Sequence, residues 1–108
     1  MKTKLVILKT GQQVIAGIKE LVSKTDSEEK CVAYLLYKPH IVTEQKRYTL
    51  MENAEEVESR EVEVTLSNWI LLSKDEEIMV QKESIITIVE PHDSLVNLYL
   101  EKTDGQNN

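Results

Sequence analysis

The stretch Leu5-Val-Ile-Leu-Lys-Thr-Gly-Gln-Gln-Val-Ile-Ala-Gly-Ile18 predicts two β-strands joined by a tight turn at Thr10-Gly11. Its first four residues are β-branched or aliphatic, and Gly11 can adopt the positive φ that a hairpin turn needs. After the turn, every second residue is apolar, as in a strand with one buried face (Val14, Ala16, Ile18). We therefore expect an antiparallel hairpin with strands at about residues 4–9 and 13–22.

The composition favours one small β-rich domain. The chain has 108 residues, of which 41% are hydrophobic, and this length supports a single modest core. There is no Phe and only one Trp, so Val, Ile and Leu must form most of that core. Such residues favour strands over helices.

Several later segments are also typical of strands. Cys31–Tyr37 is continuously apolar, as in a strand buried on both faces, although periodicity alone does not separate it from a buried helix. Pro39 cannot donate to a β-ladder and predicts an edge or a bulge. The other predicted strands are His40–Thr43 (continuing beyond the proline), Glu61–Leu66 (alternating), Ile78–Gln81 and Ser84–Val89.

The segments between and after these strands complete the prediction. Ser23–Lys30 has no hydrophobic residue and predicts a solvated loop, whereas Trp69–Leu72 is apolar on both faces and predicts further β surface before a polar turn. Residues 44–60 predict an inserted excursion between strands, such as a protruding hairpin. Asp93 is a candidate N-cap for a short helix over residues 95–99. We expect one domain over residues 1–102 and a disordered tail over residues 103–108.

Two motifs resemble those of the Sm and Sm-like family. The spacing Leu8-Lys9-x-Gly11-x-x-Val14-x-x-x-Ile18 resembles the first motif, and the aliphatic positions of Val80-Gln-Lys-Glu-Ser-Ile85-Ile-Thr-Ile88 resemble the second. The chain is also similar to Sm-like proteins of marine cyanophages. The resemblance implies an all-β fold, a small strongly bent five-stranded barrel with a short C-terminal helix. It also implies a homo-oligomeric ring of five to seven subunits, in which the fourth strand of one subunit pairs with the fifth strand of the next.

The resemblance further implies RNA binding, although the ligand positions differ from the family pattern. The family Asp position falls on Val22, and the family Arg-Gly pair falls on Gln81-Lys82. Gln81 keeps hydrogen-bonding capacity and Lys82 keeps a positive charge, but the bidentate Arg fork is absent. We expect RNA or another single-stranded nucleic acid to contact Gln81, Lys82 and the loop around Lys24, and the ring to act in RNA processing or regulation.

Charge is distributed unevenly along the chain. Residues 1–50 carry a net charge of +4 and residues 51–108 a net charge of −10, of which the segment Glu52–Glu63 supplies −5. The basic half includes a set of lysines that either form a positive face or only aid solubility (Lys2, Lys4, Lys9, Lys19, Lys24). The alternative function is therefore a scaffold ring that binds proteins through its acidic excursion and binds no nucleic acid.

No pattern for catalysis, a metal or a cofactor is present, so we expect a protein that is not an enzyme. We expect His40 and His92 to be surface-loop residues, Cys31 to be an inert buried thiol, and Trp69 to lie in the core or a subunit interface rather than stack on a base. No stretch predicts a signal peptide or a membrane span. With a single cysteine, this predicts a cytoplasmic protein, in the host cytoplasm if the chain is phage-encoded.

Overall fold

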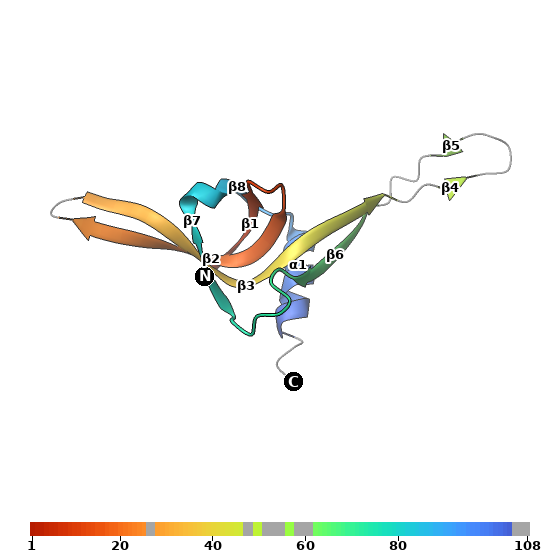
Figure 1. Ribbon diagram of the computed structural model, residues 1–108. Coiled ribbons are helices and arrows are strands. Elements are labelled where there is room, and N and C mark those ends of the chain that lie inside the picture. The colour runs from red at the N-terminus through yellow and green to blue at the C-terminus, as the bar shows by residue number, and fades with distance from the viewer. Residues whose placement is uncertain (26–27, 47–48, 51–55, 58–61, 105–108) are drawn as a thin grey trace.

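The computed structural model describes residues 1–25, 28–46, 49–50, 56–57 and 62–104. They form a mostly antiparallel β-structure with one C-terminal helix, which confirms the predicted fold class (Figure 1). The main sheet has the strand order β6-β3-β2-β1-β8, and β7 also pairs with β3. Its elements are β1 (Lys2–Leu8), β2 (Gln13–Thr25), β3 (Glu28–Lys46), β6 (Val62–Asn68), β7 (Glu77–Gln81), the 3-10 turn η1 (Lys82–Ser84) and β8 (Ile85–Val89), followed by α1 (Asp93–Asp104).

The first hairpin forms as predicted. Its register runs from Lys2↔Ile18 to Ile7↔Gln13, and Gly11 at the turn has a φ of 89°. The backbone N–H of Gly11 donates to the carbonyl of Leu8 at 2.9 Å, which closes the turn. The strand β8 then pairs with the other edge of β1, so the chain's first and last strands are neighbours.

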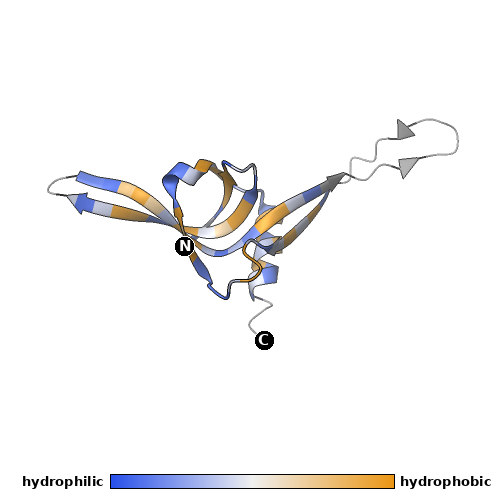
Figure 2. Cartoon of the chain, in the orientation of Figure 1, coloured by the Kyte–Doolittle hydropathy of each residue, from blue (hydrophilic) through white to orange (hydrophobic). Residues whose placement is uncertain are grey.

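The loop predicted at Ser23–Lys30 is wrong, because β2 and β3 continue as a two-stranded ribbon to the pair Thr25↔Glu28. This ribbon projects away from the body of the sheet, and its outer end is hydrophilic (Figures 1 and 2). A β-ladder needs only backbone groups, so polar residues can continue it where both faces meet solvent. For the same reason Cys31–Tyr37 is not buried on both faces: the Val32 side chain is 45% exposed.

The long strand β3 changes partners at Lys38–Pro39. Residues 33–37 pair with β7, and residues 40–46 pair with β6 along the same edge. Lys38 has a φ of 45°, and Pro39 has no N–H to donate. The predicted bulge is therefore confirmed, and β6 and β7 are two pieces of one strand position in a bent sheet of five positions.

The chain leaves the sheet between those two pieces. The apolar run Trp69–Leu72 is a bend and turn rather than further strand, and the N–H of Ser73 donates to the carbonyl of Ile70 at 3.2 Å. Leu71 and Leu72 are 76% and 97% exposed. The prediction of extra β surface is wrong here because the interruption of β3 at Pro39 removes the ladder that these residues would join.

Two hydrophobic clusters lie on opposite faces of the sheet. The inner cluster, in the concavity of the bend, contains Val14 and Ala16, whereas Ile15 belongs to the outer cluster under helix α1. Successive residues of a strand point to opposite faces, so one strand supplies both cores. The remaining buried members of the inner cluster are Val6, Leu8, Leu36 and Val80, and those of the outer cluster are Leu66 and Tyr99.

Helix α1 covers the outer cluster and differs from the prediction at both ends. It begins at Asp93, and the carbonyl of His92 accepts the N–H groups of Leu95 and Val96, so His92 rather than Asp93 occupies the cap position. Thr103, predicted to lie in a disordered tail, is in the last helical turn, and its buried hydroxyl donates to the carbonyl of Tyr99 at 2.9 Å. Residues 105–108 of that tail lie outside the described residues.

The excursion predicted for residues 44–60 begins later, because residues 44–46 continue β3 opposite β6. The remainder contains a short antiparallel pair, β4 (Thr49–Leu50) and β5 (Glu56–Val57), separate from the main sheet. The rest of the acidic segment before Val62 lies outside the described residues. The radius of gyration is 17.7 Å, against about 13 Å for a compact chain of this length, which reflects the extended arms. No helix within the described ranges is long and apolar enough to cross a membrane.

Candidate nucleic-acid interface

A cavity of about 500 Å³ opens where the β1–β2 turn, β7 and η1 approach one another. We call it the mouth cavity. Two of its wall residues, Leu8 and Val80, are buried members of the inner cluster, so the cavity adjoins that cluster. Trp69 and Met79 complete the apolar wall. The polar rim consists of Lys9, Thr10, Gln12, Gln81, Glu83 and Ser84.

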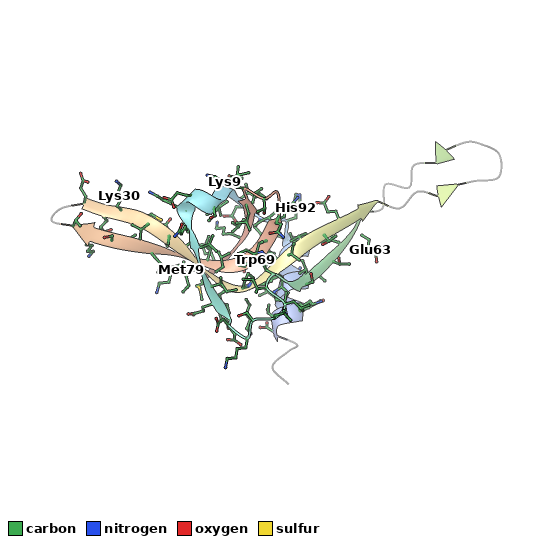
Figure 3. All side chains as sticks on the ribbon, in the orientation of Figure 1. Lys9, Lys30, Glu63, Trp69, Met79 and His92 are labelled. Atoms are coloured by element: carbon green, nitrogen blue, oxygen red, sulfur yellow. The ribbon has the colours of Figure 1, made fainter. Side chains whose placement is uncertain are left out.

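Backbone and side-chain hydrogen bonds hold the parts of this cavity together. The N–H of Lys9 donates to the carbonyl of Ser84 at 2.9 Å, which joins the end of β1 to η1. The indole N–H of Trp69 donates to Oε1 of Gln12 at 3.3 Å, which joins the loop after β6 to the β1–β2 turn. Trp69 also packs against the inner cluster, which confirms its predicted core contact. Trp69, Met79 and Lys9, which are labelled in Figure 3, line the cavity from three separate segments of the chain.

Of the predicted site residues, Gln81 lies on this cavity and Lys82 directly follows it. Gln81 is the last residue of β7 and lines the rim, and Lys82 opens η1 with an exposed side chain. Sequence reasoning missed the β1–β2 turn as part of the same site. Its only signal was the first motif, which placed Lys9 and Gly11 in a turn but did not show what the turn faces.

Lys24 lies elsewhere. It is on the exposed ribbon, where its ammonium group pairs with the carboxylate of Glu29 at 3.4 Å. Gln81 is opposite Ala33 of β3, four residues from Glu29, and four residues of strand span about 13 Å. The structure therefore does not bring Lys24 to the mouth cavity, and the nearby carboxylate offsets part of its charge.

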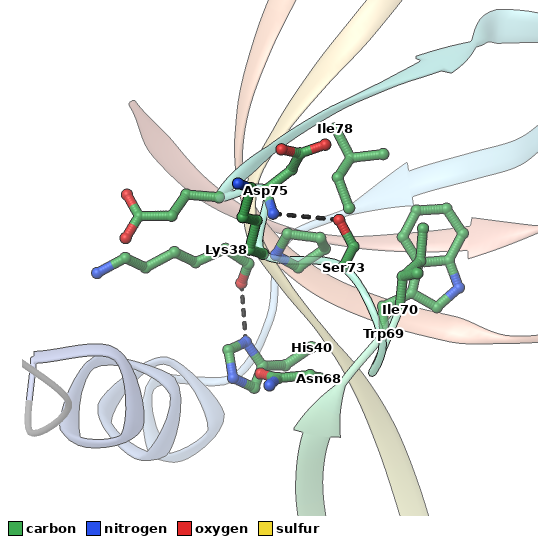
Figure 4. A pocket seen from close by; sticks show the side chains of 11 residues that line it. Lys38, His40, Asn68, Trp69, Ile70, Ser73, Asp75 and Ile78 are labelled. Carbon is green, nitrogen blue, oxygen red and sulfur yellow. Dashed lines mark hydrogen bonds between the residues drawn. The ribbon is translucent and has the colours of Figure 1, made fainter.

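A second, more polar cavity of about 230 Å³ lies where β3 changes partners (Figure 4). Its lining includes Lys38, His40, Ser73 and Asp75. The N–H of Asp75 donates to the hydroxyl of Ser73 at 3.1 Å, which shapes one wall. Within the described ranges, no cluster of three or more His, Cys, Asp or Glu residues could hold a metal ion, here or elsewhere.

His40 is buried, so its prediction as a surface-loop residue is wrong, whereas His92 is exposed as predicted. β3 passes beneath helix α1 at this point. The His40 ring lies edge-on to the Tyr99 ring, with 5.8 Å between the two ring centroids. The Nδ1 atom lies 2.8 Å from the carbonyl of Lys38, which assigns the proton to Nδ1. Nε2 is buried and has no hydrogen-bond partner among the described residues.

Four further titratable residues, Cys31, Tyr34, Tyr99 and Lys4, lie outside the two cavities described above. Cys31 is half-buried rather than buried, and a hydrogen bond between Cys31 and Tyr34, together with burial, raises the pKa of the Tyr34 hydroxyl. Burial raises the pKa of Tyr99. Lys4, one of the lysines of the basic half, pairs with Glu90, so this half is not a set of uncompensated positive charges.

Comparison with known proteins gives a family. No curated protein matches the chain significantly. The model of one family, described as a family of unknown function (DUF6561), matches residues 1–104, which include every strand of the main sheet and helix α1. The chain is therefore a member of the DUF6561 family.

Proposed function

We propose that this protein is a non-enzymatic RNA-binding protein that works as an Sm-like homo-oligomeric ring. The observation that carries the RNA-binding part is the convergence of Gln81, Trp69 and Lys9 on one cavity, with Lys82 adjacent. Single-strand binders combine positive charge for the backbone with aromatic surface for the bases, and this cavity offers both. Hydrogen-bonding capacity at Gln81 adds contacts that need no Arg fork.

The sheet edges support the ring. Among the described residues, β7 and β8 each pair with only one strand of the main sheet, and these are the fourth and fifth strand positions that the Sm-like resemblance would pair between subunits. Exposed apolar side chains lie on both strands, with Met79 63% exposed and Ile86 62% exposed. A free edge with exposed apolar residues favours pairing with another chain, and rotational closure limits that pairing to a ring.

A ring would also strengthen weak RNA contacts. Within the described ranges, the cations near the mouth cavity are chiefly Lys9 and Lys82, which lie beside the carboxylate of Glu83. Repetition of this site around a ring raises the effective concentration of each further contact along one strand. RNA binding and a single cysteine fit a reducing compartment, so we propose that the ring works in the cytoplasm.

Assembly is tested by the native mass of the purified protein. We expect a closed ring of five to seven subunits and loss of the ring in Ile86→Lys, because a charge on β8 disfavours edge pairing. The matched control is Leu100→Lys, which changes a 42% exposed apolar residue on helix α1. A monomeric wild-type protein, or a ring that persists unchanged in Ile86→Lys, would contradict this mode of assembly.

RNA binding is tested by fluorescence anisotropy with a labelled single-stranded oligouridylate. We expect affinity to fall steeply with salt, by a log–log slope of about −0.7 for each phosphate neutralised, and to fall further in Lys82→Glu. The control Lys30→Glu changes an exposed lysine on the ribbon and should leave affinity unchanged. Absence of binding at low salt would overturn the RNA-binding proposal.

A further inference from the structure

We infer that the mouth cavity takes one unstacked nucleobase of the bound strand, with the indole of Trp69 as its stacking platform. This inference rests on the proposed RNA binding and assigns the place where a base enters. The cavity volume of about 500 Å³ lies within the range of about 300–1,000 Å³ that is typical of small-ligand sites. Apolar side chains form the wall of the cavity, and polar side chains form its rim. This arrangement suits a nucleobase, which has flat apolar faces and polar edges.

Trp69 is held in place before any ligand arrives. Its backbone N–H donates to the carbonyl of Pro39 at 3.1 Å, and its indole N–H donates to Oε1 of Gln12 at 3.3 Å. The polar edge of the indole is therefore satisfied, and the side chain is only half-buried against the inner cluster. A fixed indole with exposed surface loses little conformational entropy when a base stacks on it. Met79, 63% exposed on the same cavity, is flexible enough to adjust to the base.

The rim supplies hydrogen bonds for the edge of a base. Oε1 of Gln12 accepts both the Trp69 indole N–H and the Thr10 hydroxyl, the latter at 3.3 Å, so the amide NH₂ of Gln12 is the group left for a ligand. The exposed amide of Gln81 offers both a donor and an acceptor. Since stacking tolerates every base, we expect only a modest preference among the four bases.

The charges beside the cavity favour a nucleobase within a nucleic-acid strand over a nucleobase in a free nucleotide. Lys9 is on the rim and Lys82 adjoins Gln81, where each can meet a phosphate on either side of the inserted base. Glu83 on the same rim opposes phosphate and limits the affinity of each single site. A mononucleotide and an oligonucleotide share the base chemistry, so the two are separate arms of the test.

Trp69 is the only tryptophan in the chain and lines both the mouth cavity and the second cavity, so its fluorescence reports a ligand that enters either one. We expect a single-stranded oligouridylate to quench that fluorescence saturably, at the same concentrations that raise the anisotropy of the labelled strand. Inorganic polyphosphate and an abasic ribose-phosphate strand should give no quenching, because they have no base to stack. Uridine monophosphate should quench only at concentrations at least tenfold higher.

Substitutions of Trp69 separate a loss of base stacking from a loss of folding. Trp69→Leu should weaken oligouridylate binding by about tenfold and Trp69→Phe by less, because the phenyl ring keeps an aromatic face. The native mass and the thermal midpoint of each variant report whether it folds. If Trp69→Leu does not fold, the quenching of the unaltered protein still decides the inference.

The outcomes distinguish this inference from the function on which it rests. Binding by anisotropy without Trp69 quenching, or with unchanged affinity in a folded Trp69→Leu, would overturn the base site and leave RNA binding intact. Equal quenching by the mononucleotide and the oligonucleotide would also overturn it, in favour of a free-nucleotide site. No binding by anisotropy at low salt would instead overturn the proposed function.

Discussion

The hydroxyl of Tyr99 on helix α1 donates a hydrogen bond of 2.8 Å to the backbone carbonyl of Tyr37 in β3. The same hydroxyl accepts from the N–H of Gly17 in β2 at 3.3 Å. One side chain thus joins the helix to two strands at the buried face of the sheet. A Cβ at Gly17 would lie 3.4 Å from the Cβ atoms of Met1 and Tyr37, which is ordinary van der Waals contact, so the hydrogen bonds rather than the absence of a side chain at Gly17 define this junction.

We expect Tyr99→Phe to lower the free energy of unfolding by about 1–3 kcal/mol, because it leaves the half-buried carbonyl of Tyr37 without this donor and the N–H of Gly17 without its acceptor. The ring and its apolar contacts stay, so only the hydrogen bonds change. Urea denaturation measures the loss. Tyr34→Phe is the control on β3, where the hydroxyl is not part of the helix contact, and an equal loss in both variants would contradict the special role of Tyr99.

Stability should fall at alkaline pH through the same residue. Burial raises the pKa of Tyr99 above its ordinary value of 10.0, so the unfolded chain loses this proton first as the pH rises. The resulting contribution to stability is complete below pH 10.0 and is lost as the pH rises towards the folded pKa. Thermal midpoints measured from pH 8 to pH 11 should fall less steeply in Tyr99→Phe than in the unaltered protein, and parallel curves would refute this assignment.

The two histidines should differ sharply in their effect on stability. His40→Leu removes the donor to the carbonyl of Lys38, a residue held at a φ of 45°, and should cost about 1–3 kcal/mol. His92→Leu changes an exposed side chain and should stay within about 0.5 kcal/mol. Chemical denaturation of both variants measures the difference, and similar values would mean that the His40–Lys38 hydrogen bond contributes little.

Gly11→Ala should destabilise the protein by about 1 kcal/mol through the backbone alone. Gly11 has a φ of 89°, and no atom lies within 4 Å of the position that a Cβ would take. The cost is therefore conformational strain rather than a clash. Denaturation checks the magnitude, and Gly11→Asn should recover part of the loss because Asn tolerates positive φ better than Ala.

Glu83→Gln should raise the affinity for single-stranded RNA by about twofold at low salt, since it removes one negative charge from the rim of the mouth cavity. The gain should shrink as salt is added. Anisotropy titrations at two salt concentrations measure both effects. The control Glu29→Gln is on the ribbon, and the same gain there would point to net charge rather than to the mouth cavity.

Local sequence patterns were sufficient to predict the elements whose conformation depends on neighbouring residues. The first hairpin follows from Gly11 and the period-two apolar residues, and the two short strands β7 and β8 follow from brief apolar runs between polar residues. Each of these depends on turn conformation or side-chain alternation, which neighbouring residues alone decide. The same patterns indicated an all-β fold with a final helix.

Long-range pairing decided the rest. Ser23 and Thr25 look like loop residues, yet they continue β2 because β3 runs alongside and supplies a backbone partner. Trp69–Leu72 looks like a strand, yet it leaves the sheet because β3 is interrupted at Pro39. A β-ladder forms only where a partner strand lies alongside, and the hydrophobicity of one segment does not show whether such a partner is present.

The candidate site divides in the same way. The sequence alone identified Gln81 and Lys82 through motif spacing but placed Trp69 in the core or a subunit interface, and only the folded chain joins Trp69 to Gln12 across 57 residues. It also buries His40, which the sequence placed in a surface loop, because helix α1 packs over β3 at that point. Spacing along the chain determines which groups a strand can present, and the packing of distant segments determines which of them meet.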